Sequence, residues 1–202
     1  PGTLDIVSEL EGVLRRNAEH PGACHFYIHA VEGSLDPGRA LACAERLPGL
    51  MPGAGHLVHM PAHIYFRLGR YADAIAANHL AADVDEKFIR DQQPVGVYPS
   101  MYYPHNLHFL AVASAWAGQS AAAIEAARRL ERAMPVSEVA ATPALGYFVP
   151  LVPITLSRFT LWKERLAEPS PGAGLRVIGG VSHYSRAPPC TPAAPAYSAA
   201  RA

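Results

Sequence analysis

The chain contains 202 residues, enough to bury the core of one domain or of two small ones. It carries 17 acidic and 17 basic side chains, so its zero net charge gives no reason to expect nucleic acid or an anionic membrane as a partner. No apolar run approaches the roughly 20 residues that a membrane-spanning helix needs. The first residue is Pro1 rather than methionine, which fits a processed chain or a segment of a longer one.

Cysteine and histidine usage carry different information. Cys24, Cys43 and Cys190 show no CxxC spacing, so we expect the first two to be small buried hydrophobic side chains. This usage favours a reducing, cytoplasmic compartment. Histidine is the compositional outlier, because nine of the ten histidines lie between His20 and His108.

Three helices are predicted in the first quarter of the chain. Residues 3–17 place leucines and valines on one stripe and arginines in the last turn, where cations suit the helix dipole. Residues 23–33 form the next helix, after the His-Pro-Gly turn at residues 20–22. Residues 39–47 form a short alanine-rich helix, closed by the Pro-Gly pair that follows.

Two further helices follow after a Met-Pro-Gly turn. Residues 54–68 carry three histidines and end in Leu-Gly-Arg-Tyr. Pro61 lies inside this stretch, so either it kinks the helix or the helix begins only at Met60. Residues 71–89 form a long helix with alanines along one side, and small side chains let neighbouring helices approach closely.

Residues 90–104 are predicted to be a loop, because prolines and a glycine interrupt them. Tyrosines are interleaved with these residues directly before His105, where a lid would contact a substrate. The alternative is a loop packed against the body of the protein. The candidate substrate-binding residues are Tyr98, Tyr102 and Tyr103.

The remaining helices are shorter and less regular. Residues 105–116 and 121–134 read as helices, the second capped by a serine. Residues 142–157 are apolar but contain three prolines, so the pattern does not decide whether they are helical. Residues 159–167 form a short helix.

The composition changes at residue 168. Proline, glycine, serine and alanine dominate from there, and the helical periodicity disappears. Such a segment lacks the apolar side chains to bury a core. We therefore predict one helical domain at residues 1–167, followed by an irregular or disordered tail at residues 168–202.

The helical part repeats the order helix, tight turn, helix. The Pro-Gly-Ala-x-His pattern that begins at Pro21 recurs 31 residues later, and a Gly-Arg pair recurs at the same spacing. The His-x-x-His pattern that begins at His56 recurs 49 residues later, and Gly69 has a counterpart in Gly118 at that spacing. Two landmarks that agree on each offset indicate internal repeats.

The corner of this repeat points to a family. Leu68-Gly69-x-Tyr71-x-x-Ala74 resembles the tetratricopeptide repeat signature, and two degenerate corners near Gly118 and Phe159 are similar to it. The His-Pro-Gly-Ala, His-Leu-Val-His-Met-Pro-Ala-His and Tyr-Tyr-Pro-His segments resemble motifs of bacterial tetratricopeptide proteins of unassigned function. The resemblance implies an all-α fold of stacked antiparallel helix pairs in a right-handed solenoid. The first helix of each pair would line its concave face.

Histidines recur on the predicted first helices. Three of them, at positions i, i+3 and i+7 of residues 54–68, lie on one helical face. The copies at residues 23–33 and 105–116 place imidazoles or a carboxylate at matching levels. If these helices pack side by side, their polar side chains converge on one surface. The candidate metal ligands are His25, His29, His56, His59, His63, His105 and His108, with Glu32 as a further ligand or a general base.

Neutral imidazole is the commonest side-chain metal donor, and several histidines with one carboxylate suit Zn, Fe, Cu or Mn better than Ca or Mg. The leading hypothesis is a protein that binds a transition metal ion, and that uses it as a hydrolytic or oxidative enzyme if coordination positions stay open. The alternative is a non-catalytic scaffold that binds a peptide or protein in the concave groove. Protonated histidines that hold a small acidic ligand, and a homo-oligomer, also stay open.

Overall fold

The computed structural model describes residues 2–134, 139, 142–148, 150–169 and 180. All regular structure in these ranges is helical, and they contain no strand, as the all-α prediction required. The predicted tail, residues 168–202, and with it Cys190, lies almost entirely outside the described residues. None of the helices in the described ranges is long and apolar enough to cross a membrane.

The first helices begin and end where local chemistry requires. Helix α1 spans Thr3–Arg16 and α2 spans Pro21–Glu32. Proline at the first turn of α2 loses no helical hydrogen bond, and the His20 ring nitrogen Nδ1 accepts the Ala23 N–H, which caps the helix. A short 3-10 turn, η1 (Pro37–Ala40), leads into α3 (Leu41–Leu50).

Helix α3 continues past the predicted end at Leu47. Pro48 lies inside its last turn, and the Met51 N–H still bonds the Leu47 carbonyl oxygen at 3.2 Å. A proline this close to the end removes one backbone donor but does not stop the turn. The prediction that the Pro-Gly pair closes this helix was therefore wrong by one turn.

The histidine-bearing stretch forms two short helices. Helix α4 spans Gly55–His59 and α5 spans Pro61–Arg67, with Met60 between them. The break follows from Pro61, which has no N–H to give to the carbonyl one turn earlier. His59 and His63, on either side of the break, still meet, with their Nε2 atoms 2.9 Å apart. Helix α6 (Tyr71–Gln92) then runs back alongside both.

The predicted loop at residues 90–104 is largely helical, which corrects the prediction. Helix α6 continues to Gln92, and Tyr98–Tyr102 forms a single π-helical turn, η2. This turn leads directly into α7 (Tyr103–Trp116), whose second residue is a proline and costs no helical hydrogen bond there. The later elements are α8 (Ser120–Ala133), the 3-10 turn η3 (Pro143–Tyr147), α10 (Leu151–Arg158) and α11 (Trp162–Ala167).

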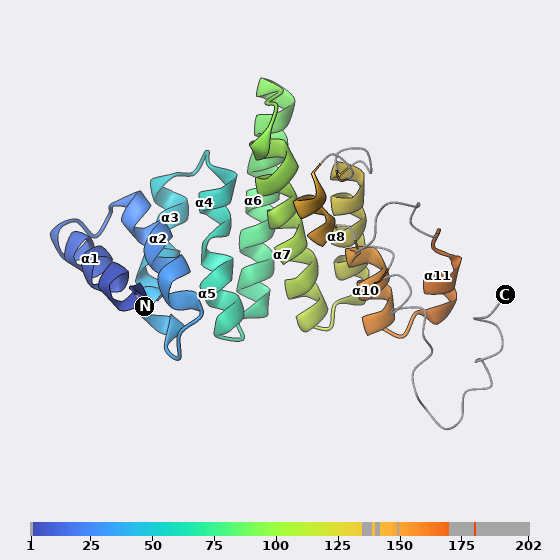
Figure 1. Cartoon of the computed structure of the whole chain (residues 1–202), viewed down its shortest axis with the longest axis horizontal. Helices are drawn as coiled ribbons and strands as arrows, with labels where there is room; N and C mark the ends of the chain where they lie inside the picture. Colours follow the sequence, from blue (N-terminus) through green and yellow to red (C-terminus); the bar gives the residue numbers. More distant parts are fainter. Residues whose placement is uncertain (1, 135–138, 140–141, 149, 170–179, 181–202) are drawn as a thin grey trace.

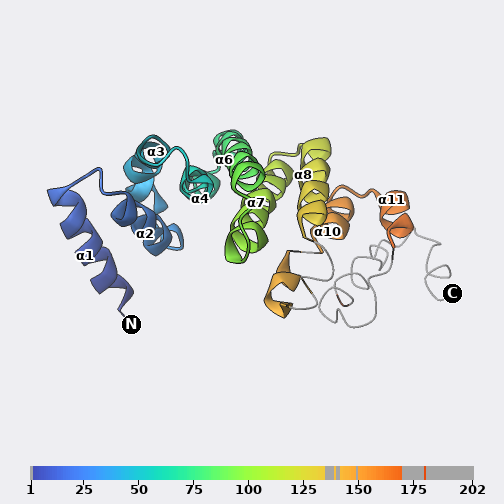
Figure 2. The same cartoon turned by 90° about the horizontal axis from the view of Figure 1, so that it is seen from above.

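The helices follow one another in chain order along one row (Figure 1), seen from above in Figure 2. Each helix packs mainly on its sequence neighbours. Several contacts also join elements that are not consecutive, among them α2 with α5 and α4 with α7. The histidine-bearing segments α2, α4–α5 and α7 therefore lie side by side, and α6 packs behind α4 and α5.

Three corners of the row share one backbone geometry. Gly69 and Gly118 have φ of 74° and 75°, and Thr160 has φ of 56°. At each corner a backbone N–H reaches back five residues to a carbonyl oxygen, the arrangement of a Schellman helix end. These bonds are Arg70 to Tyr65 at 2.8 Å, Gln119 to Ser114 at 2.9 Å and Leu161 to Leu156 at 3.0 Å. The repeat seen in the sequence therefore recurs in the backbone.

Small side chains bring the helices together around three apolar clusters. Ala74, Ala81 and Ala82 of α6 are completely buried, whereas Ala72 and Ala76 of the predicted alanine side are exposed. One cluster joins α1, α2 and α3 to α5, and another joins α6 and α7 to α8 and α10. The third, smaller cluster lies between them around Ala62 and Ala113. The polar site described below lies over this middle region.

Cys24 on α2 and Cys43 on α3 are both buried, as expected from the sequence, and their Sγ atoms lie 2.6 Å apart. The sequence spacing did not reveal this pair.

In a Cys190→Ser background, we expect hydrogen peroxide to oxidise the two thiols to one disulfide, with two waters released. Closing this loop stabilises the fold by about 3 kcal/mol. Mass spectrometry after thiol alkylation measures how many of the two cysteines remain as free thiols. Two free thiols after peroxide treatment would contradict the expectation.

Candidate metal centre

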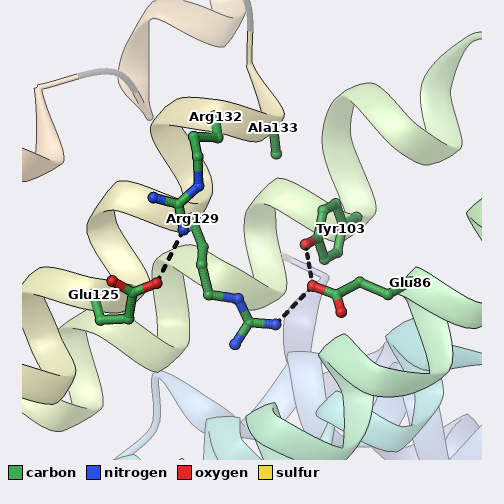
Figure 3. Close-up of a pocket in the computed structure, with 6 residues that line it drawn as sticks. All are labelled: Glu86, Tyr103, Glu125, Arg129, Arg132 and Ala133. Carbon is green, nitrogen blue, oxygen red and sulfur yellow. Dashed lines mark hydrogen bonds and ion pairs between the residues drawn. The ribbon is translucent and has the colours of Figure 1, made fainter.

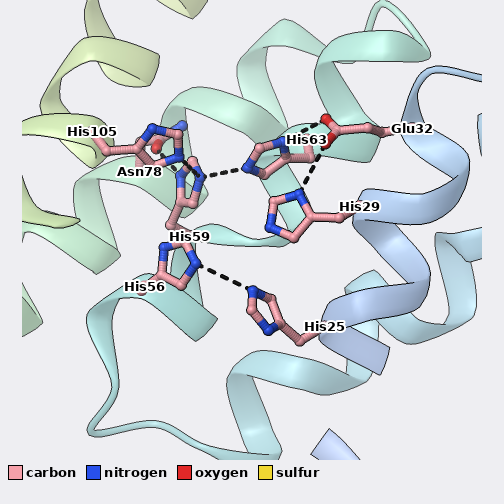
Figure 4. A network of polar contacts seen from close by, with 8 residues as sticks. All are labelled: His25, His29, Glu32, His56, His59, His63, Asn78 and His105. Atoms are coloured by element: carbon pink, nitrogen blue, oxygen red, sulfur yellow. Dashed lines mark hydrogen bonds and ion pairs between the residues drawn. The ribbon is translucent and has the colours of Figure 1, made fainter. Parts of the chain in front are cut away.

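Six imidazoles and one carboxylate converge where the histidine-bearing helices meet (Figure 4). Helix α2 contributes two histidines and Glu32, α4 and α5 contribute three histidines, and α7 contributes one. The donors form three overlapping groups, and within each group the donor atoms lie within 4.8 Å of one another. We call them the inner group (His56, His59, His105), the outer group (His25, His29, His56) and the carboxylate group (His29, Glu32, His63).

His59 is completely buried, and its hydrogen bonds define where its proton sits. The Asn78 side-chain Nδ2 donates to the Ala74 carbonyl at 2.7 Å, so Asn78 Oδ1 is left as an acceptor. His59 Nδ1 lies 2.7 Å from that oxygen and must donate to it. The other ring nitrogen, Nε2, therefore carries a lone pair in the neutral imidazole.

His63 has the same arrangement. Its Nδ1 lies 2.6 Å from Glu32 Oε2, a carboxylate oxygen that can only accept, so Nδ1 donates to it and Nε2 points toward His59. The Nε2 atoms of His59 and His63 are 2.9 Å apart, and His105 Nε2 is 3.0 Å from His59 Nε2. The lone pair of His59 Nε2 therefore lies where ring nitrogens of His63 and His105 meet, a position that a metal ion could occupy.

The three imidazoles of the inner group have lowered pKa values. Burial, the largest effect, together with neighbouring imidazoles, lowers the pKa of His56 to about 4 and that of His105 to about 3. Burial and the adjacent His63 hold the pKa of His59 well below its ordinary value. At neutral pH these imidazoles are therefore neutral, which is the form that binds metal ions and cannot hold an acidic ligand by charge.

The spacing of the donors fits a metal ion. Two nitrogens bound to one zinc ion at about 2.1 Å lie roughly 3.4 Å apart in a tetrahedral site. The shortest nitrogen pairs here lie at 2.9, 3.0 and 3.2 Å. In addition, His56 Nδ1 is buried and has no hydrogen-bond partner, an arrangement that a metal ion would relieve.

Glu32 holds two of the histidines. One carboxylate oxygen accepts from His29 Nδ1 at 2.9 Å and the other accepts from His63 Nδ1. Burial alone would raise the pKa of Glu32, but the bonds from His29 and His63 outweigh it and set the pKa at about 2. Histidine ligands of metal sites commonly donate their second N–H to a carboxylate in this way.

The other predicted site residues lie around this centre. Tyr98 and Tyr103 donate their phenol protons to Asp85 and Glu86 of α6, each at 2.6 Å. The Tyr102 ring lies 4.7 Å from the His56 ring, centre to centre, and borders the outer group. His108 belongs to none of the three groups, since its ring packs on Tyr147 and Phe148. His79 on α6 lies outside this centre and is exposed.

Two polar residues that the sequence did not point to support the centre from α6. Asn78 fixes the proton of His59, as described above. Asp85 is completely buried and accepts hydrogen bonds from Tyr98 and from Asn106 Nδ2, the latter at 2.7 Å. It lies directly against Gly55, the residue before His56, so it fixes the start of α4. No spacing rule links residues of a second helix to a site on its neighbours.

A separate cavity of about 610 Å³ lies between α6, the start of α7 and α8 (Figure 3). Arg129 pairs with Glu86 at 2.7 Å and Arg132 with Glu125 at 2.9 Å. Because both guanidinium groups already have carboxylate partners, this cavity offers little to attract an anionic ligand. The histidine centre is therefore the stronger candidate site.

The buried histidines predict how the metal-free protein responds to acid. Histidines with lowered pKa values bind fewer protons in the folded chain than in the unfolded chain between pH about 6.5 and about 4. The free energy of unfolding is therefore highest above pH 6.5. It falls as the pH decreases, by roughly 1.4 kcal/mol per pH unit for each such histidine. Thermal melts of metal-free protein at pH 7, 6 and 5 measure this, and an unchanged midpoint would contradict it.

Neither a scan against protein-family models nor searches of the curated proteins and the solved structures found a match for this chain. Fold and site together define an all-helical protein whose buried histidine clusters could hold a metal ion.

Proposed function

We propose that this chain is a tetratricopeptide-like repeat protein that binds a transition metal ion at the inner group, His56, His59 and His105. The observation that carries the proposal is the convergence of these three side chains, whose donor atoms lie within 4.8 Å of one another, with Nδ1 of the buried His59 already committed as a donor to Asn78. His63 Nε2, 2.9 Å from His59 Nε2, is within reach as a fourth ligand after a small shift. Zinc, copper, iron and manganese all accept such a donor set.

The repeat assignment is part of the proposal. Its support is the shared backbone geometry of the three corners and the side-by-side packing of α2, α4–α5 and α7. Stacked helix pairs of this kind form a solenoid whose first helices line a concave face. In this proposal the histidine centre lies on that face.

A catalytic role follows if the ion keeps open positions. Three neutral imidazoles leave at least one coordination position and the full charge of the ion, the conditions under which metal-bound water becomes a hydroxide near neutral pH. This favours hydrolytic or oxidative chemistry on a small molecule or peptide. Tyr102, beside His56, is the tyrosine placed to contact such a substrate, while Tyr98 and Tyr103 hold the η2 turn on α6.

The second candidate function is a scaffold that binds a peptide without catalysis. The observation that favours it is Phe26, which is 60% exposed and packs against the ring of His25. An exposed aromatic beside half-exposed imidazoles suits a peptide side chain. In this alternative the histidines bond the peptide and no metal is needed.

Titration of the tag-free, metal-free protein with Co(II) tests the metal proposal. We expect visible ligand-field absorption that saturates at a fixed number of ions per chain and that zinc displaces. The matched control is His79→Ala, which removes an exposed histidine outside the three groups. Unchanged absorption on adding cobalt would overturn the proposal and favour the peptide scaffold.

Glu32 provides a sharper test of how the ligands are held. In Glu32→Gln the amide accepts from one histidine but turns its own N–H groups toward the other, so we expect zinc affinity to fall about 10- to 100-fold. Competition with a chromophoric chelator measures this, with Glu45→Gln on the exposed face of α3 as control. An unchanged affinity combined with lost turnover would instead assign Glu32 as a general base.

A further inference from the structure

The ring of His56 lies between two groups of donors. It belongs to the inner group with His59 and His105, and to the outer group with His25 and His29. Its ring centre is 5.8 Å from that of His59 and 5.2 Å from that of His25. Figure 4 shows the ring with His25 of α2 on one side and with His59 of α4 and His105 of α7 on the other.

The outer group has the spacing of a metal site. His25 Nε2 and His56 Nε2 lie 3.2 Å apart, close to the separation of two nitrogens on one tetrahedral ion. His29 adds a third donor from the next turn of α2, and Glu32 fixes its Nδ1. Unlike the buried His59, the side chain of His29 is 37% exposed, so solvent reaches the outer group.

The two nitrogens of His56 are used differently. Nε2 faces His25, whereas Nδ1 is buried and has no hydrogen-bond partner. The two ring nitrogens of an imidazole point in diverging directions, so one metal ion cannot be bound by both. A single ring that serves both groups therefore needs one ion at each nitrogen.

We propose that the centre holds two metal ions, bridged by His56. The inner ion is bound by His59, His105 and His56 Nδ1, and the outer ion by His25, His29 and His56 Nε2. This inference rests on the proposed function, because it places a second ion beside the first. When both ions bind, His56 loses its ring N–H proton to solvent and becomes an imidazolate that donates one lone pair to each ion.

The net charge of such a centre indicates which kind of ligand it would bind. Two divalent ions against one imidazolate and the Glu32 carboxylate leave a net charge of about +2. The exposed outer ion would therefore bind hydroxide or a small anion, such as a carboxylate or phosphate group of a substrate. Among the described donors no second carboxylate neutralises it.

Copper titration of the metal-free, tag-free full chain tests the bridge. We expect two Cu(II) ions per chain by elemental analysis. The first equivalent should give a full mononuclear electron paramagnetic resonance signal, and the second should lower the signal per copper, because an imidazolate couples the two spins. The double variant His25→Ala, His29→Ala should bind one ion with an uncoupled signal, and the exposed-site control His79→Ala should bind two.

The outcomes separate the two proposals. One ion per chain in both the native protein and the double variant would overturn the bridged pair and leave the inner site standing. Two ions with fully additive, uncoupled signals would overturn the His56 bridge. No bound copper would overturn the bridged pair together with the proposed function. Circular dichroism of the double variant confirms that it keeps its helices, since both substituted side chains lie at the open side of the centre.

Discussion

Replacing His59 with alanine is expected to lower the affinity for zinc or cobalt more than 100-fold, the largest functional effect of any single substitution. His59 is completely buried and its Nε2 is the meeting point of His63 and His105. Its removal takes away one ligand and leaves Asn78 Oδ1 without its donor. A loss larger than the 10- to 100-fold typical of a supporting residue is therefore expected.

The measurement is competition against a chelator of known affinity, with thermal melts of each metal-free variant alongside. His59→Gln keeps a side chain of similar reach and separates the loss of a ligand from the loss of packing. His79→Ala serves as the matched control, because His79 is exposed and lies in none of the donor groups. If the affinity of His59→Ala for the metal stays within a factor of about three of the native value, His59 is not a ligand.

Replacing Gly55 with alanine should have the largest effect on stability. A Cβ at this position would lie 1.9 Å from Asp85 Oδ1, far inside contact distance. Asp85 cannot yield easily, since Tyr98 and Asn106 hold its two oxygens at 2.6 and 2.7 Å. We expect a loss of about 3 kcal/mol or more, which lowers the melting temperature by roughly 6–12 °C for a chain of this size.

Gly49→Ala is the matched control for this substitution. Gly49 lies in α3, and a Cβ there meets nothing within 4 Å, so the change should be neutral or stabilising by up to about 1 kcal/mol. Thermal melts of the two variants measure the difference. If Gly55→Ala has the same melting temperature as the native protein, Asp85 is not the rigid support that we describe. Because His56 follows Gly55, weaker metal binding should accompany the loss of stability.

Most of the fold could be predicted from local sequence patterns. Apolar periodicity located α1, α6 and α8, and the glycines at positions 69 and 118 marked corners because both adopt a positive φ. The pattern was less reliable near proline. Pro48 did not end α3, Pro61 divided the central helix, and the prolines of residues 90–104 concealed the η2 turn. In each case the position of proline within the turn decides the outcome.

The candidate site was accessible to sequence reasoning only in part. Repeat spacing placed His25, His56 and His105 on neighbouring helices, and the structure places His56 in one donor group with His25 and in another with His105. His108 shares the pattern but packs on aromatic rings instead. Asn78 and Asp85 could not have been foreseen, because they act on the site from a helix whose register against its neighbours no single-sequence pattern encodes.

The central claim is that neutral, converging imidazoles hold a transition metal ion. The most direct test is elemental analysis of tag-free protein, purified without chelator and then dialysed against metal-free buffer. We expect at least one transition metal ion per chain, retained through dialysis and lost in His59→Ala. Metal below about a tenth of an ion per chain, with no uptake on adding zinc, copper, cobalt or iron, would contradict it.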